Sequence, residues 1–108
     1  MVKRLKFNDK GLIPAIIQDI DSAEVLMLGY MNKESLALTL SNGEVWFYSR
    51  SRQELWHKGA TSGNKLIVRE IWLDCDRDTV LVKAEPMGSV CHTGERTCFF
   101  QKLPEENK

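Results

Sequence analysis

The sequence lacks the features of an exported, disulfide-stapled protein. Its 108 residues contain no CxxC pair, and its three cysteines are an odd number. The first residues, MVKRLKFNDK, are basic but lead into no apolar core, so we expect no secretory signal peptide. Disulfides are rare in the reducing cytosol, where cysteines more often bind metals or react as thiols. We therefore predict a cytoplasmic protein whose cysteines are metal ligands or reactive groups.

The sequence also has no net charge and no long hydrophobic run. Fifteen lysines and arginines balance fifteen aspartates and glutamates, so no overall field attracts nucleic acid or an anionic membrane. No apolar stretch approaches the ~20 residues that span a bilayer. We find no internal repeat or linker. Residues 1–108, with 43% hydrophobic side chains, are predicted to form a single globular domain that binds neither nucleic acid nor membrane.

Hydrophobic patterning predicts a mainly β or α+β fold. Asn32 is placed to cap a short helix, with Leu36 and Leu40 on one face and Gly43 just past its end. Ser51 begins a capping-box pattern that predicts a second helical turn. The expected architecture is a compact mixed sheet with one or two short helices. The predicted strands are 12–18, 24–30, 44–49, 65–74, 79–84 and a last one near 97–101.

Three aspartates in the segment DCDRD, namely Asp74, Asp76 and Asp78, are spaced by two. On an extended strand this spacing places all three carboxylates on one face, although a straight strand holds the outer two about 13 Å apart. Either the chain bends there, or only two of the carboxylates bind one ion. Ligands that are all oxygen suit a hard ion, and we predict Mg²⁺.

Two other interpretations of the aspartates compete with magnesium. One is a solvated acidic strand end, because charge clusters are often ordinary surface. The other is a calcium loop, since Asp74, Asp76, Asp78 and Glu85 match positions 1, 3, 5 and 12 of an EF-hand. Position 6 of that loop needs glycine and here is Thr79, and the flanking residues are strand-like. The EF-hand interpretation is therefore disfavoured.

Cys75, Cys91 and Cys98 are candidate thiolate ligands, and clustered thiolates favour zinc. On a strand Cys75 points away from the aspartates, which favours two separate metal sites. His92 would make a closed structural site if it ligates zinc, and would move protons to and from a bound water if it stands beside the ion. Each cysteine alone is also compatible with a small buried hydrophobic residue. A thiol oxidoreductase ranks last because a CxxC is absent.

The segment from Tyr48 to Lys65, YSRSRQELWHKGATSGNK, is unusually polar for the middle of a small domain. Its cationic side chains, hydroxyl groups and glycines are materials for binding phosphate. Trp46 and Trp56 could stack on a base, but burial in the core is the commoner role of tryptophan. The predicted substrate contacts are Ser49, Arg50, Arg52, His57, Lys58, Thr61, Ser62 and Asn64.

Four segments carry a resemblance to a known family: MLGYMNKESL (27–36), SRSRQELWHKGATSGN (49–64), DCDRD (74–78) and CHTGERTCF (91–99). The chain resembles the monofunctional phosphoribosyl-AMP cyclohydrolases of histidine biosynthesis over nearly its whole length. The resemblance implies an intertwined homodimer with active sites at the subunit interface. It implies zinc bound by Cys75 of one chain and by Cys91 and Cys98 of the other, and magnesium bound by the three aspartates. The chain departs from the family pattern at 84–90, AEPMGSV, where a glutamine and a small residue commonly precede the cysteine.

The implied reaction is hydrolysis of the N1–C6 bond of the adenine ring in phosphoribosyl-AMP. We expect His92 to accept a proton from a zinc-activated water and to pass it towards N1, while magnesium and residues 49–64 hold substrate oxygens. The alternative function is a structural-zinc module that binds a nucleotide or RNA, in which His92 closes the zinc site. Removing zinc would unfold such a module, but would abolish the activity of an enzyme before its fold.

Overall fold

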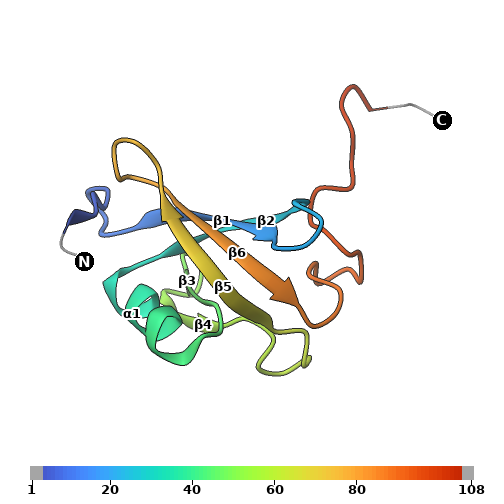
Figure 1. The fold of residues 1–108 in the computed structure, drawn as a ribbon, viewed down its shortest axis with the longest axis horizontal. Coiled ribbons are helices and arrows are strands. Elements are labelled where there is room, and N and C mark those ends of the chain that lie inside the picture. The colour runs from blue at the N-terminus through green and yellow to red at the C-terminus, as the bar shows by residue number, and fades with distance from the viewer. Residues whose placement is uncertain (1–3, 106–108) are drawn as a thin grey trace.

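The computed structural model describes residues 4–105. Its larger sheet has four strands in the order β2–β1–β6–β5, and Figure 1 shows this sheet across the middle of the molecule. β1 pairs antiparallel with β2 and parallel with β6, which pairs antiparallel with β5. The predicted mixed sheet is therefore confirmed. The four strands are β1 (Ile13–Asp19), β2 (Val25–Met31), β5 (Leu66–Leu73) and β6 (Val80–Pro86).

A helix and a two-stranded hairpin cover one face of this sheet (Figure 1). The helix is α1 (Lys33–Asn42), and the hairpin consists of β3 (Trp46–Ser49) and β4 (Glu54–His57). β3 packs against both β2 and α1. A Cβ atom on Gly29 of β2 would lie 2.7 Å from the Phe47 ring of β3, so this approach of the two layers requires glycine. Within the described residues, no helix is long and apolar enough to cross a bilayer.

Local hydrogen bonds set both ends of α1. Asn32 Oδ1 accepts a hydrogen bond from the Ser35 N–H at 2.8 Å, and Ser35 Oγ accepts one from the Asn32 N–H at 2.9 Å. These reciprocal bonds satisfy two N–H groups that the helix itself leaves free. Gly43 ends the helix with a left-handed φ of 74°, and its N–H donates to the Thr39 carbonyl. The predicted start and end of the helix are confirmed.

The core lies between the sheet and the layer formed by α1, β3 and β4. Phe47 of β3 is 1% exposed, and Trp56 of β4 packs on it with 5.4 Å between ring centroids. Burial of these apolar side chains is the main force that holds the hairpin on the sheet. Alternate residues of β1 and β6 point into this core and are fully buried: Ile13, Ala15, Ile17, Val80, Val82 and Ala84.

Two predicted elements are wrong. Residues 50–53 form the turn of the β3–β4 hairpin and not a helical turn, and Gln53 has a left-handed φ of 53°. The described residues 97–101 form no strand. Thr97 Oγ1 instead donates to the Val25 and Leu26 carbonyls of β2, and the Cys98 N–H donates to the Leu26 carbonyl. The other predicted strands and the helix agree with the structure to within two residues at each end.

An ion-pair cluster ties residues 87–98, which we call the thiol segment, to the β1–β2 turn. Arg96 Nη2 donates to Asp19 Oδ2 at 2.5 Å, and Arg96 Nε donates to Glu24 Oε1 at 2.6 Å. Asp19 is 6% exposed and also accepts hydrogen bonds from the N–H groups of Asp21 and Ser22. The Arg96 guanidinium lowers the pKa of the Asp19 carboxyl, against the opposing effect of burial. These contacts fix the thiol segment, near the C-terminal end of the described chain, to the turn between the first two strands.

We expect Asp19→Asn to reduce the free energy of unfolding at pH 7 by about 2 kcal/mol, because it breaks charge-assisted hydrogen bonds to a buried carboxylate. The pKa of Asp19 is lower in the folded than in the unfolded chain, so its contribution is complete at neutral pH and is lost as the pH falls below about 4. Urea unfolding of wild type and Asp19→Asn at pH 7 and pH 3 measures the difference in their free energies of unfolding, which should be smaller at pH 3. Asp21→Asn, in the same turn but exposed, should change stability by under about 0.5 kcal/mol. Equal losses in the two variants would contradict the role of the ion pair.

Candidate active site

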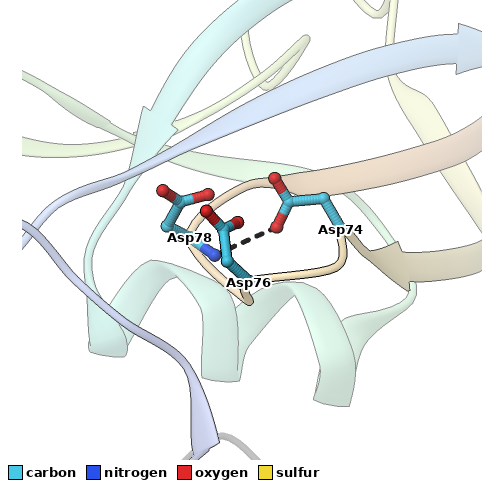
Figure 2. A group of neighbouring side chains, drawn as sticks. All are labelled: Asp74, Asp76 and Asp78. Atoms are coloured by element: carbon cyan, nitrogen blue, oxygen red, sulfur yellow. Dashed lines mark hydrogen bonds between the residues drawn. The ribbon is translucent and has the colours of Figure 1, made fainter.

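The three aspartates lie together in the turn between β5 and β6, residues 74–78, which we call the acidic turn. Figure 2 shows the carboxylates of Asp74, Asp76 and Asp78 on one side of this turn, and their ligand oxygens lie within 4.8 Å of one another. The Asp78 N–H donates to Asp74 Oδ1 at 3.1 Å, and Arg77 takes a left-handed φ of 65°. The chain therefore bends here. A straight strand is therefore wrong for these residues, and the bend, which was one of the two predicted alternatives, is what brings them together.

Mutual repulsion suits the acidic turn to a cation. The pKa of Asp78 is raised, first by a hydrogen bond with the neighbouring Asp76 carboxyl, then by desolvation, and also by the hydrogen bond and the negative charge of Asp74. Desolvation acts to raise the pKa of Asp74. Several hydrogen bonds to its carboxylate, the strongest of them from the Asp78 N–H, together outweigh desolvation and lower this pKa. A hard divalent ion would relieve the repulsion between the carboxylates, and carboxylate oxygens are ligands that Mg²⁺ takes.

Two of the three cysteines lie together in the thiol segment. Cys91 is buried and Cys98 is exposed, and each thiol influences the pKa of the other. A hydrogen bond from Thr93 Oγ1 to Cys91 Sγ, at 3.0 Å, lowers the pKa of Cys91, whereas desolvation raises that of Cys98. Neighbouring thiols, one of them biased towards the thiolate, fit a thiophilic metal such as zinc.

Cys75 lies apart from this pair. It is exposed in the acidic turn, before β6, whereas Cys91 follows β6. Figure 1 shows the β5–β6 turn and the segment after β6 at opposite ends of the sheet. The seven residues of β6 span about 23 Å at roughly 3.3 Å per residue. Among residues 4–105, three potential ligands come close enough to share an ion only in the aspartate group, so the three cysteines of one chain do not form such a group. A single chain thus supplies two thiols at one end of β6 and the third at the other.

A cavity of about 490 Å³ joins the thiol segment to the polar segment 48–65. Cys91 and His92 line it from the thiol segment, and His92 is exposed. Six of the eight predicted substrate contacts therefore share a cavity with the predicted proton carrier. The residues of the polar segment that line it include Arg52, His57, Lys58, Thr61, Ser62 and Asn64.

His57 is held in this cavity from two directions. Its ring stacks on Trp46 with 4.4 Å between centroids, and its Nε2 lies 2.7 Å from Glu44 Oε1. Lys65 Nζ lies 3.7 Å from the same Glu44 oxygen. Glu44 is not among the predicted site residues, because no local pattern signals a contact with a residue 13 positions away. These contacts make His57 a fixed part of the cavity wall.

Ser49 and Arg50 do not line this cavity. They face β2 and line a separate hollow of about 270 Å³, where the Arg50 guanidinium lies 4.0 Å from the centroid of the Tyr30 ring. Ser49 Oγ accepts a hydrogen bond from the Arg52 N–H. Ser49 and Arg50 lie outside the larger cavity because they stand at the end of β3, where the hairpin turns next to β2. The structure thus divides the predicted substrate contacts between two hollows.

Comparison with known proteins identifies the family. The sequence model described as phosphoribosyl-AMP cyclohydrolase matches residues 27–100. The chain belongs to the phosphoribosyl-AMP cyclohydrolase family. All four segments that carry the resemblance lie within the matched range, so the family predicted from them is confirmed.

Relatives within the phosphoribosyl-AMP cyclohydrolase family match most of the chain. A phosphoribosyl-AMP cyclohydrolase of Clostridium beijerinckii is 61% identical over 93 residues, which are 86% of this chain and 85% of the relative. Histidine biosynthesis bifunctional proteins HisIE of Bacillus subtilis and Caldanaerobacter subterraneus are 60% and 54% identical over 94% and 99% of this chain. The chain spans 49% and 52% of these two relatives, which is about half of their length.

Proposed function

We propose that this protein hydrolyses the N1–C6 bond of the adenine ring of phosphoribosyl-AMP in histidine biosynthesis. The observation that carries the proposal is the cavity that joins Cys91 and His92 to the polar segment, in a chain of this family. The substrate presents a base, two riboses and two phosphates. The hydroxyl, amide and cationic groups around the cavity are suited to hold its many oxygens.

The reaction requires a group that moves one proton. Water adds to C6 through a new C–O bond, the N1–C6 bond breaks, and its electron pair passes to N1, which takes up a proton. We propose that a ring nitrogen of His92 accepts the water proton and then delivers it to N1. His92 is exposed, lies next to Cys91 and lines the cavity, so substrate and water can both reach it.

The ligand sets fit two different metal ions. We propose that Cys75, Cys91 and Cys98 hold zinc, because clustered thiolates are its preferred ligands. A bound zinc ion supplies Lewis acidity, which lowers the pKa of water from 15.7 to about 7 in favourable sites. We propose that the acidic turn holds magnesium, which binds carboxylates and commonly keeps positions for substrate oxygens.

A homodimer would complete both sites. In the folded chain the seven residues of β6, about 23 Å of strand, lie between Cys75 and the other two cysteines. A second copy, related by a two-fold axis, can present its acidic turn and Cys75 to the thiol segment of the first, which produces two equivalent sites. We therefore propose that the metals and the substrate bind at the interface of two copies. The proposed ligand is this small molecule, and the zero net charge disfavours nucleic acid or membrane as a partner.

The direct test of the proposal is the ultraviolet spectrum of phosphoribosyl-AMP during incubation with zinc-loaded protein and Mg²⁺. We expect the adenine spectrum to change as the ring opens. Cys91→Ala, at the same Mg²⁺ concentration, should fold but leave the spectrum unchanged, because it lacks a thiolate ligand. If folded, zinc-loaded wild type also leaves the spectrum unchanged, the enzyme proposal is wrong and the structural-zinc binding module becomes the better interpretation.

Mixing of inactive variants tests the shared site. Cys75→Ser and Cys91→Ser should each be inactive, but when unfolded together and refolded they should regain about a quarter of wild-type activity, since half of the dimers are mixed and each has one intact site. The control is Cys91→Ser mixed with Cys98→Ser, which should stay inactive because both losses fall on the same half of the site. Recovery in the control, or none in the first mixture, would contradict the proposed interface.

The role of His92 has its own signature. We expect His92→Ala to lower kcat by about 10²–10⁴-fold, the range for general acid–base catalysis, with zinc content unchanged. Turnover and bound zinc should be measured on the same preparation. Loss of zinc would instead make His92 a ligand of a closed site, and normal turnover with zinc bound would rule out proton transfer by this residue.

A further inference from the structure

Lys58 differs from the other cationic residues of the polar segment because it is buried. Lys58 is 8% exposed, whereas the side chains of Arg52 and Lys65 are 67% and 39% exposed. Those two each lie 3.7 Å from a glutamate. Within the described part of the chain, no carboxylate forms an ion pair with Lys58. A buried ammonium is costly unless a negative group compensates it, so its surroundings need an explanation.

The groups around the Lys58 ammonium come largely from the thiol segment. Nζ donates to the Val90 carbonyl at 2.5 Å and lies 5.5 Å from the centroid of the Trp56 ring. Val90 is 1% exposed and immediately precedes Cys91. Burial lowers the pKa of Lys58, and the negative charges of Cys98 and Cys91 oppose this effect. The Val90 carbonyl and the sulfur atoms of Cys91 and Cys98 are therefore the electron-rich groups that the fold places around this ammonium.

Hydrogen bonds show how the two cysteines are held. The N–H groups of Val90 and Cys91 donate to carbonyls of the same segment, at Arg96 and Glu95. The Cys98 N–H donates to a carbonyl of β2 at 2.8 Å. The bond from Lys58 to Val90 joins the Cys91 half of the segment to the end of β4. Removing it would free the chain directly before Cys91.

We propose that Lys58 is a positioning residue for the Cys91–Cys98 thiol pair and does not contact substrate. Its ammonium fixes the carbonyl that precedes Cys91, so that the pair is held in place to receive a thiophilic divalent metal. Once both thiols are deprotonated for metal binding, the pair and the ammonium together would carry a net charge of −1, and −2 without the ammonium, so deprotonation of the thiols is harder in its absence. This inference rests on the proposed zinc site.

The test is the Zn²⁺ affinity of the full-length protein, measured by competition with a chelator at pH 7. Lys58→Met keeps most of the apolar stem but removes the ammonium, and we expect it to bind Zn²⁺ about 10–100-fold more weakly, as for other groups that orient metal ligands. Lys65→Met is the matched control, because this lysine belongs to the same segment but is partly exposed and paired with Glu44. The control should bind Zn²⁺ as tightly as wild type.

A second variant separates the hydrogen bond from the charge. Lys58→Gln keeps a donor for the Val90 carbonyl but carries no charge, and we expect an affinity between those of wild type and Lys58→Met. Unchanged Zn²⁺ affinity in folded Lys58→Met, with a raised KM for substrate, would overturn the proposal and make Lys58 a substrate contact. Loss of the fold in both variants without zinc, seen by circular dichroism, would also overturn it, because the ammonium would then be a general packing requirement.

Failure of the zinc site itself gives a different result. If Cys91→Ala and Cys98→Ala bind Zn²⁺ as tightly as wild type, the thiols are not the ligands and both proposals are wrong. If the cysteine variants lose Zn²⁺ but Lys58→Met does not, the zinc site stands and the role assigned to Lys58 is wrong.

Discussion

Strand β6 lies in the middle of the sheet, paired in parallel with β1 on one side and antiparallel with β5 on the other. Its Val80, Val82 and Ala84 side chains are fully buried, so a shift of register would move them out of the core. The acidic turn precedes this strand and the thiol segment follows it. The length of this central strand therefore separates the two sets of proposed metal ligands within a chain.

The two ends of β6 differ in the groups that surround their candidate ligands. At the thiol end, one cation from a distant part of the fold, Lys58, bonds next to Cys91, and the segment's own Arg96 pairs with Asp19 and Glu24. At the other end the three carboxylates are exposed and close enough to perturb one another. The two ends of β6 therefore offer chemically different groups, sulfur at one end and carboxylate oxygen at the other.

The sequence predicted what depends on local chemistry. The caps of α1 at Asn32 and Gly43 and the strand boundaries follow from side-chain hydrogen bonds and alternation within a few residues. Ser51 shows the limit of such signals, because its capping-box register was overridden by the pairing of β3 with β4. The aspartates were grouped from their spacing of two, which shares a face on a strand and also brings side chains together in the tight turn that the structure shows.

Contacts between distant segments could not be predicted in the same way. Lys58 stands in a polar run that suggests solvent and phosphate, but its partner is a carbonyl 32 positions later. Glu44, 13 positions before His57, likewise gave no local signal. Burial of a charged side chain is decided by the three-dimensional packing of all segments around it, which a single sequence does not encode in any short pattern.

Ala15 on β1 pairs with Val80 on β6, a residue that the ribosome adds 65 positions later. At roughly 5–20 residues per second, the inner edge of β1 waits about 3–13 s for its partner during synthesis. The β1–β2 hairpin can form in that interval, but it presents an unpaired, apolar strand edge of a kind that recruits other nascent chains. The finished fold covers this edge with β6, so the exposed edge belongs to the growing chain alone.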